Sequence, residues 1–198
     1  LKEEEDAEAG QVRALADNAD RSIESAHGLL RALLNLSRLE AGGVKPSVGA
    51  LSVRAMFDDL RREFTPVAAA KGVRLTIVPS DLWIASDRDL LRSLLQNLIG
   101  NAVRYTDRGA VLVGVRRMGN RVRVDVIDSG RGIPPDQQEA IFGEFTRLPG
   151  MGGDEIGAGL GLAIVRRVAG LLDHRLTLES EVGRGSCFGV ELPRAAPA

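Results

Sequence analysis

The sequence has 198 residues, of which 44% are hydrophobic, so it is long enough to bury the core of one domain, or of one domain with an appendage. The formal net charge is −1 although arginine far outnumbers lysine, which argues against the basic excess of a nucleic-acid-binding protein. The single cysteine, Cys187, excludes an intramolecular disulfide and, with only His27 and His174 as further ligands, a zinc site.

The first 46 residues predict one long helix, from about residue 9 to residue 40. Its apolar residues recur at heptad spacing at Val12, Leu15, Ala19, Ala26, Leu29, Leu33 and Leu36, and Ile23, Leu30, Leu34 and Leu39 widen the stripe. Gly42, Gly43 and Pro46 end the pattern. Because an isolated helix would leave so broad a stripe in water, we expect it to pack against another helix in a homodimer.

After Pro46 the pattern predicts a mixed α/β domain over residues 47–194. In chain order it indicates a strand and helix within 50–72, strands near 73–79 and 82–86, and a helix whose capping box is Ser86 and Asp89. A hairpin turning at 118–120, a glycine-dense loop over 145–161, a helix over 161–172 and a meander at the sheet edge, 175–181 and 187–193, follow. Residues 195–198 resemble the start of a linker or tail.

The predicted helix after residue 86 contains two asparagines, Asn97 and Asn101, although asparagine is a poor residue for a helix interior. Together with Arg104 and Tyr105 they form a polar band beside the leucines, because helical neighbours are three and four residues apart. Carboxamide oxygens suit Mg²⁺, and Arg104 could lie near phosphate oxygens. Equally, the asparagines could tether neighbouring loops by hydrogen bonds to the backbone.

Three glycine-containing segments follow in order. In DSGRG, Asp128 ends an alternating strand, and Gly130 and Gly132 allow a sharp turn and a planar ligand's approach, although Asp-Gly turns also end strands for structural reasons. GAGLGL opens a helix, where free amides favour phosphate; its spacing is not that of a dinucleotide or Walker loop. GRGS, with Gly183 and Gly185, is by itself an ordinary hairpin turn.

The order of the asparagine pair and these segments, with Phe142 and Phe145 between DSGRG and GAGLGL, resembles the ATP-binding catalytic domain of bacterial sensor histidine kinases. That family shares the Bergerat-type fold of gyrase and heat-shock chaperone ATPases, and the resemblance runs from about Ser52 to Pro193. It implies a two-layer α/β (α+β) sandwich, a mixed sheet covered on one face by helices. The N-terminal stretch is similar to the second helix of the kinase dimerisation module, in the version of cytoplasmic, often hybrid, kinases.

The resemblance assigns roles to particular residues. NLIGNAVRYT looks like the N box, implying that Asn97 and Asn101 hold Mg²⁺ and phosphates while Arg104 and Tyr105 approach the nucleotide. DSGRG looks like the G1 box, implying that Asp128 accepts a hydrogen bond from the adenine amine. IFGEF with Arg147 looks like the F box and the start of the ATP lid. The implied nucleotide-binding set is completed by Gly130, Gly132, Ile133, Phe142, Gly157, Gly159, Leu160, Gly161, Leu162, Gly185 and Ser186, and the implied catalytic set is Asn97, Asn101 and Arg147.

Asn97 stands where hydrolytic relatives usually carry a glutamate that activates water, and a carboxamide is a poor general base. We therefore expect phosphoryl transfer from ATP rather than hydrolysis. The acceptor histidine should lie in a His-Asp/Glu-x-x-x-Pro segment of the first dimerisation helix. His27 lacks this context, and His174 lies outside every motif, so we expect the fragment alone to bind ATP without phosphorylating itself.

The resemblance also implies a response regulator or receiver domain as partner. Two alternatives stay open: a serine-type kinase or ATPase of the same fold, and a non-enzymatic nucleotide-binding dimerisation scaffold. No apolar run reaches the roughly 20 residues of a membrane-spanning helix, and the acidic start is unlike a signal peptide. We therefore expect a cytoplasmic fragment with no direct membrane contact and no nucleic-acid partner, in a protein that could be membrane-anchored elsewhere.

Overall fold

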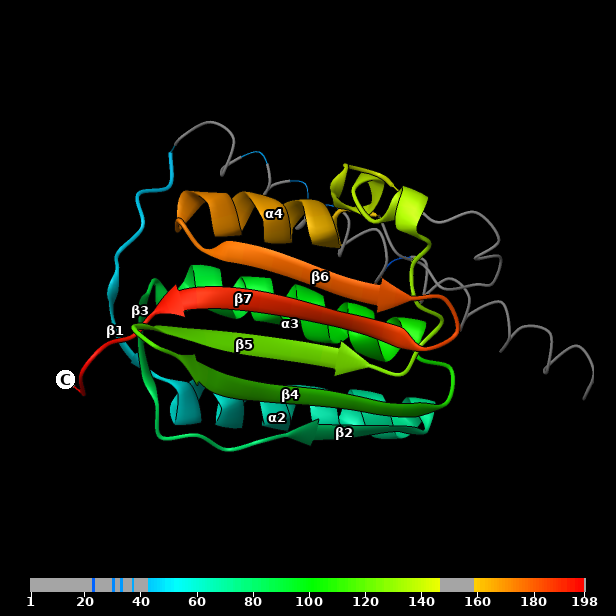
Figure 1. Ribbon diagram of the computed structural model, residues 1–198, viewed down its shortest axis with the longest axis horizontal. Coiled ribbons are helices and arrows are strands. Elements are labelled where there is room, and N and C mark those ends of the chain that lie inside the picture. The colour runs from blue at the N-terminus through cyan, green and yellow to red at the C-terminus, as the bar shows by residue number, and fades with distance from the viewer. Residues whose placement is uncertain are drawn as a thin grey trace, which may run out of the picture.

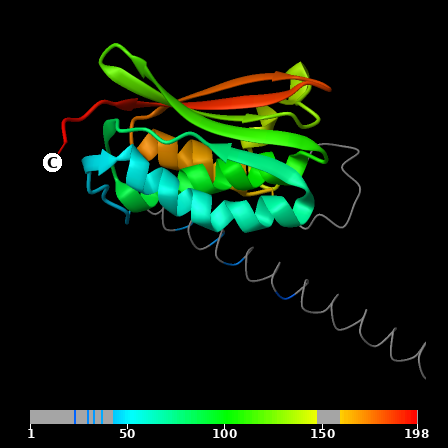
Figure 2. The same ribbon diagram turned by 90° about the horizontal axis from the view of Figure 1, so that it is seen from below.

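The computed structural model describes residues 43–146 and 159–197, together with the helical positions Ile23, Leu30, Leu33 and Ser37. Within these residues a five-stranded sheet forms one layer and three helices form the other (Figures 1 and 2). The predicted two-layer sandwich with a mixed sheet is therefore confirmed. The predicted N-terminal helix as a whole, and most of the glycine-dense loop, lie outside the described residues.

The helices are α2 (Val53–Lys71), α3 (Arg88–Tyr105) and α4 (Gly161–Leu171), with 3-10 turns η1 (Pro135–Gln137) and η2 (Ala140–Phe142). The strands are β1 (Gly49–Ser52), β2 (Val73–Ile77), β3 (Trp83–Ser86), β4 (Gly109–Met118), β5 (Arg121–Asp128), β6 (Arg175–Glu181) and β7 (Gly185–Pro193). None of the described helices is both long and apolar enough to cross a membrane.

The strand order of the main sheet is β2-β4-β5-β7-β6. Strand β2 runs parallel to β4, and the other neighbours are antiparallel. The predicted hairpin is confirmed: β4 and β5 pair with Met118 opposite Arg121 across the turn. Strands β6 and β7 form a hairpin at the sheet edge, as predicted. They do not continue a meander, because β7, not β6, lies next to β5.

The core lies between the sheet and the helices. On β5 the valines alternate inward, and Val122, Val124 and Val126 are at most 1% exposed. The helix α3 meets them with the leucines predicted from its periodicity, Leu91, Leu94, Leu95 and Leu98, each at most 1% exposed. Burying one such side chain stabilises the fold by about 1.5–3 kcal/mol, so this layer fixes the position of α3 and of the polar residues on its adjoining side.

The start of α3 differs from the predicted capping box. The N-cap is Asp87, whose carboxylate accepts hydrogen bonds from the amides of Asp89 and Leu90, both at 3.0 Å. Ser86 is the last residue of β3, and its side chain is fully buried. Its hydroxyl lies 2.8 Å from Nε2 of His174, in the turn between α4 and β6. The inward alternation of β3 takes Ser86 away from the helix end, so the adjacent aspartate caps it.

Candidate active site

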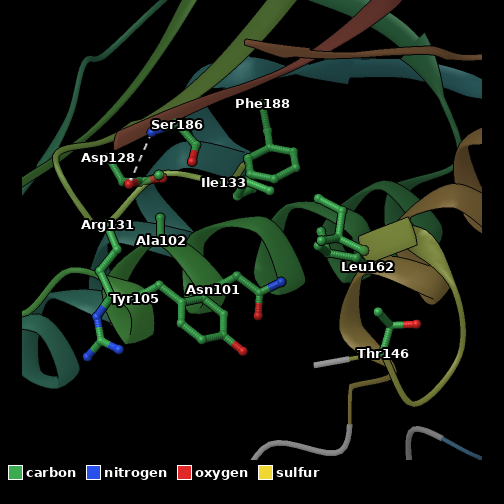
Figure 3. Close-up of a pocket in the computed structure, with 12 residues that line it drawn as sticks. Asn101, Ala102, Tyr105, Asp128, Arg131, Ile133, Thr146, Leu162, Ser186 and Phe188 are labelled. Atoms are coloured by element: carbon green, nitrogen blue, oxygen red, sulfur yellow. Dashed lines mark hydrogen bonds between the residues drawn. The ribbon is translucent and has the colours of Figure 1, made fainter. Parts of the chain in front are cut away.

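A pocket opens between α3, the end of β5, η2 and the start of α4 (Figure 3). It is lined by Asn101, Ala102, Tyr105, Asp128, Arg131, Gly132, Ile133, Ile141, Thr146, Leu162, Ser186 and Phe188. These residues come from six separate stretches of the chain. Tertiary packing, rather than any one motif, therefore makes the pocket.

A buried carboxylate, that of Asp128, stands at one end of the pocket. Asp128 is the last residue of β5 and is 8% exposed. Its Oδ1 accepts hydrogen bonds from the amides of Gly130 (2.8 Å) and Ser186 (3.3 Å). Burial raises the pKa of Asp128 above its ordinary value, and the two amides oppose that shift. Both hydrogen bonds use Oδ1, so the carboxylate has capacity to accept another from a ligand donor.

The glycines around Asp128 are required mainly by contacts between loops. Gly132 has φ +70°, and a Cβ atom there would lie 2.0 Å from the carbonyl oxygen of Glu181. Gly185 has φ +104°, and a Cβ atom there would lie 2.0 Å from the carbonyl oxygen of Asp128. Both positions combine a positive φ with a close backbone contact, which only glycine tolerates. The DSGRG and GRGS segments therefore pack closely together and fix the position of Asp128.

Two carboxamides of α3 meet the first residue of α4. The Nδ2 group of Asn97 donates to the carbonyl of Ser93 at 2.8 Å, one turn back in its own helix. A Cβ atom on Gly161 would lie 3.0 Å from Asn97 Oδ1 and 3.7 Å from Asn101 Oδ1. The two side-chain oxygens therefore lie together at the N-terminus of α4, where the helix dipole favours anions.

This arrangement fits Mg²⁺ bound with phosphates. In the described ranges, no group of three or more His, Cys, Asp or Glu side chains could hold a metal ion. Mg²⁺ keeps several waters and needs few protein ligands, and neutral amide oxygens are hard donors that suit it. The donor set at Asn97 and Asn101 is therefore appropriate for Mg²⁺ but too small for a metal held by the protein alone.

Part of the pocket wall is apolar. Ile133, Ile141, Leu162 and Phe188 line it, and Figure 3 shows the rings of Phe188 and Tyr105 extending into the space on different sides of it. Phe142 lies behind this wall, with its ring centroid 6.3 Å from that of Phe188 in an edge-to-face arrangement. A planar, largely apolar group with one hydrogen-bond donor matches this pocket.

An ion pair stands at the rim next to Tyr105. Both Nε and Nη2 of Arg131 lie 3.0 Å from the carboxylate oxygens of Asp107. This bidentate pair, led by the Arg131 hydrogen bond, lowers the pKa of Asp107 below its ordinary range. The ion pair joins the end of α3 to the DSGRG segment. The spacing of residues in the sequence could not predict that Arg131 pairs with Asp107, nor the geometry of the pair.

The structure brings most of the predicted residues together. Seven of them line the pocket directly: Asn101, Tyr105, Asp128, Gly132, Ile133, Leu162 and Ser186. Gly130, Gly185, Gly161, Leu160, Gly159, Phe142 and Asn97 adjoin the pocket-lining segments. Arg104 is not among the lining residues, and its carbonyl accepts a hydrogen bond from Lys71. Arg147 and Gly157 lie outside the described residues.

Five lining residues were not predicted: Ala102, Arg131, Ile141, Thr146 and Phe188. Ala102 lies inside NLIGNAVRYT and Ile141 begins IFGEF, but both carry ordinary apolar side chains, as does Phe188, so their residue type gave no sign of a site. Arg131 lies inside the DSGRG segment and Thr146 directly follows IFGEF. Only their positions within or beside these motifs could have identified them as site residues.

Comparison with known proteins places the fold and the pocket in a family. Residues 86–196, more than half of the chain, match the family described as histidine kinase-, DNA gyrase B- and HSP90-like ATPases. The chain belongs to this family. The matched range includes every described pocket residue, and the expected Bergerat-type fold is therefore confirmed.

The chain is similar to named kinases of this ATPase family. The sensor histidine kinase AruS of Pseudomonas aeruginosa is 35% identical over 203 residues, which cover 93% of this chain and 19% of AruS. The sensor-like histidine kinase SenX3 of Mycobacterium tuberculosis is 32% identical over 190 residues, covering 92% of this chain and 45% of SenX3. The chain thus spans about a fifth of AruS and less than half of SenX3.

A solved structure of another ATPase-family kinase has the same arrangement. Full-length ShkA in complex with AMPPNP matches with a TM-score of 0.75 and 32% identity, covering 86% of this chain and 36% of ShkA. The histidine kinase AdeS of Acinetobacter baumannii matches with a TM-score of 0.73 at 20% identity, covering 88% of this chain and 81% of that chain, and so shows the shared fold alone.

Proposed function

We propose that this chain is the ATP-binding catalytic part of a sensor histidine kinase of a two-component system. It binds Mg²⁺-ATP and transfers the γ-phosphoryl group to a histidine of the dimerisation module, for relay to a response regulator. The observation that carries the proposal is the pocket itself, with the buried carboxylate of Asp128 at one end and the carboxamide of Asn101 on α3 (Figure 3).

The adenine base is expected in the apolar part of the pocket. Asp128 would accept a hydrogen bond from its exocyclic amine, since the carboxylate is fixed by two backbone amides and shares the pocket with the apolar side chains of Ile133 and Phe188. Tyr105 and Ile133 would cover the faces of the base. Guanine presents a carbonyl oxygen at the position of this amine, so a carboxylate there favours adenine.

The phosphates are expected where α3 meets the N-terminus of α4. Asn97 and Asn101 would ligate Mg²⁺ through their side-chain oxygens, and the first amides of α4 would donate to phosphate oxygens. Arg104 and Arg147, with the remaining glycines of GAGLGL, are proposed to approach the phosphates. When bound, Mg²⁺ supplies neutralisation of charge on the transferred group.

Transfer rather than hydrolysis is proposed because of Asn97. Its amide group donates to the Ser93 carbonyl, and a carboxamide cannot take a proton from water at neutral pH. Water at this place would therefore remain a weak nucleophile, and the γ-phosphoryl group would be kept for the acceptor histidine.

The rest of the proposal concerns the whole protein. Residues 1–46 are proposed to supply the second helix of the dimerisation module, residues 47–194 the catalytic domain and residues 195–198 a linker or tail. The protein would act as a cytoplasmic homodimer through that helix, with a response regulator or receiver domain as partner. The named sensor kinases among its relatives support this assignment.

Calorimetric titration of the full chain with a non-hydrolysable ATP analogue tests the nucleotide site. Binding should require Mg²⁺, and Asn101→Ala should weaken Mg²⁺-dependent binding by about tenfold or more, the equivalent of about 1.4 kcal/mol. Ser47→Ala, at an exposed position in the segment before β1, is the matched control and should bind as the parent does. Equal affinity of the Asn101 variant and the parent would overturn the site assignment.

Incubation with radiolabelled ATP tests the reaction. The chain alone should acquire no acid-labile phosphate, whereas addition of a dimerisation module with an intact histidine segment should yield acid-labile, base-stable label on that module. Steady release of inorganic phosphate, or acid-stable label on serine, would instead support the ATPase or serine-kinase alternative.

A further inference from the structure

Arg131 connects three segments at the rim of the pocket. It belongs to the loop that follows β5. Its backbone carbonyl accepts a hydrogen bond from the amide of Gly183, in the turn between β6 and β7, at 2.7 Å. Its side chain forms the bidentate pair with Asp107, which lies two residues after the end of α3. One residue therefore ties the β6–β7 turn and the loop after β5 to the end of α3.

The segments that this side chain joins carry different walls of the pocket. Asp128 ends β5 directly before the loop, and Tyr105 is the last residue of α3. The loop lies against the helix end, since a Cβ atom on Gly130 would lie 2.4 Å from the carbonyl oxygen of Tyr105. Figure 3 shows the Arg131 side chain leading away from Asp128 toward the end of α3 that carries Tyr105. A shift of the loop relative to α3 would therefore change the spacing between Asp128 and Tyr105.

The ion pair lies at the end of the pocket that is expected to receive the base. The carboxamides of Asn97 and Asn101, the proposed metal ligands, meet the N-terminus of α4. Asn97 lies about two helical turns, or about 12 Å, before the last residue of α3, and Asp107 lies beyond that end. Two nitrogens of the Arg131 guanidinium bond to Asp107. This geometry suits Arg131 to hold the loop rather than to bind a phosphate.

The exposure of the pair sets the size of its effect. The side chains of Arg131 and Asp107 are 44% and 56% exposed, so water screens their attraction and the gain from the pair is modest. A second cation lies nearby: the ammonium of Lys71 donates to the carbonyl of Arg104, and its charge adds to the larger effect of the Arg131 hydrogen bond in lowering the pKa of Asp107. A change at Arg131 therefore does not leave the Asp107 carboxylate without a neighbouring positive charge.

We propose that Arg131 is a positioning residue for nucleotide binding, which through Asp107 holds the loop after β5 against the end of α3 and so fixes the spacing between Asp128 and Tyr105. The inference rests on the proposed function, because it concerns the same pocket. Arg131 acts through Asp107 and not by contact with a phosphate. The pair preorganises the part of the pocket that receives the base, and therefore affects affinity more than stability.

Calorimetric titration of the full chain with Mg²⁺ and a non-hydrolysable ATP analogue tests the proposal. Arg131→Met removes the ion pair but keeps an unbranched side chain and the backbone bond to Gly183, and Asp107→Ala removes the pair from the other side. Each should weaken binding by about fivefold, the equivalent of about 1 kcal/mol. The double variant should also lose about fivefold rather than about 25-fold, because both changes remove one interaction.

Asp107 is not among the residues that line the pocket, so its effect on affinity must pass through Arg131. Parent-like affinity of Asp107→Ala, or a loss of about 25-fold in the double variant, would overturn the proposal. Either result would mean that Arg131 does not act through Asp107.

Titration with Mg²⁺-ADP separates positioning from contact with the terminal phosphate. Arg131→Met should lose the same factor, within about twofold, for ADP and for the ATP analogue, because the pair lies at the base end of the pocket. A loss several times larger for the ATP analogue would show that Arg131 binds the terminal phosphate, and the positioning role would be wrong.

Arg54→Met is the matched control. Arg54 forms an exposed pair with Asp81 at 2.7 Å, and neither residue lines the pocket, so this variant should bind both nucleotides as the parent does. Equal weakening by Arg54→Met would assign the effect to lost surface charge and contradict the proposal. Urea denaturation should give Arg131→Met a midpoint close to that of the parent. A lowered midpoint with unchanged affinity would show a merely structural role.

The same titrations distinguish this proposal from the proposed function. A parent chain that does not bind the ATP analogue contradicts the proposed function itself. A parent that binds the analogue, with Arg131→Met binding it equally well, contradicts only the role of Arg131.

Discussion

Gly161 lies so close to the carboxamide of Asn97 that a Cβ atom at position 161 would lie 3.0 Å from Asn97 Oδ1. The same atom would lie 3.5 Å from Asn101 Nδ2. The first residue of α4 is therefore packed directly on the polar side of α3. Both proposed metal ligands are in this contact. A methyl group at position 161 would therefore disturb nucleotide binding more than it would reduce the stability of the fold.

Gly161→Ala is expected to weaken Mg²⁺-dependent binding of an ATP analogue by about tenfold, since Asn97 must shift to admit the methyl group. The free energy of unfolding should stay within about 1 kcal/mol of the parent, because alanine suits a helix. Gly170→Ala in the same helix meets nothing within 4 Å and should leave binding unchanged. Titration calorimetry and urea denaturation measure the two quantities. Similar losses in both variants would show that α4 itself, not the contact, is responsible.

Asp128→Asn is expected to weaken binding of the ATP analogue by about tenfold or more, because the amide presents a donor where the adenine amine needs an acceptor. In the parent, affinity should fall as the pH is lowered toward the raised pKa of Asp128 and its carboxylate takes up a proton. Titrations at several pH values measure this, and the variant should lack that dependence. Parent-like affinity in Asp128→Asn would remove Asp128 from the proposed site.

Ionisation of Asp128 should also lower the free energy of unfolding of the chain. Since burial raises its folded-state pKa, the folded chain holds this proton more tightly than the unfolded chain. The contribution of the protonated form is therefore lost as the pH rises through the raised pKa. At neutral pH we expect Asp128→Asn to be at least as resistant to urea as the parent, so weakened nucleotide binding cannot be attributed to unfolding.

Ser86→Ala is expected to reduce the free energy of unfolding by about 1–2 kcal/mol. Nδ1 of His174 already has no hydrogen-bond partner in the described structure, so the change would leave both ring nitrogens unpaired in a buried position. Urea denaturation measures the loss, and Ser47→Ala, at an exposed residue, is the control. An unchanged midpoint would show that the Ser86 contact with His174 contributes nothing to stability.

The same histidine predicts a pH dependence. Burial lowers the pKa of His174, so the folded chain binds its proton less tightly than the unfolded chain. The stability that neutral His174 contributes is complete above about pH 6.5, the ordinary value for histidine, and is lost as the pH falls below it. His174→Gln should flatten the decline in melting temperature between pH 7 and pH 5. An equally steep decline in the variant would assign it to other groups.

Leu33→Glu is expected to convert the predicted homodimer to a monomer. Leu33 is helical and 47% exposed, and Ile23 and Leu30 of the same predicted helix are 56% and 55% exposed, so each offers apolar surface to a partner. Light scattering after size exclusion gives the mass. Val67→Glu places the same charge at a 53% exposed apolar residue of α2 and should not change it. A monomeric parent, or a dimeric Leu33→Glu chain, would contradict the prediction.

Much of the fold could be predicted because the spacing of apolar residues along each segment determines which face of the helix or strand is buried. The alternating valines of β4 and β5 specify which face is buried, and the turn at Gly119 and Asn120 fixes their register. Asp128 could be selected as a candidate site residue only through the resemblance of DSGRG to the family's motif, because an Asp-Gly turn at a strand end is by itself a weak signal. The capping of α3 could not be predicted correctly, since Ser86 and Asp87 are both good N-caps and only the burial of β3 decides between them.

By itself the sequence determined the buried faces of the elements, the order of the polar and glycine motifs and, through Asn97, the chemistry expected of the site. Only the tertiary structure decided that β7 separates β5 from β6, that Ser86 meets His174, and that Gly161 rests on Asn97. The physical reason is the sequence separation over which each kind of interaction acts. Periodicity and turns act over a few residues, whereas these contacts join segments far apart in the chain and depend on how whole layers pack; Ser86 and His174, for example, are 88 positions apart.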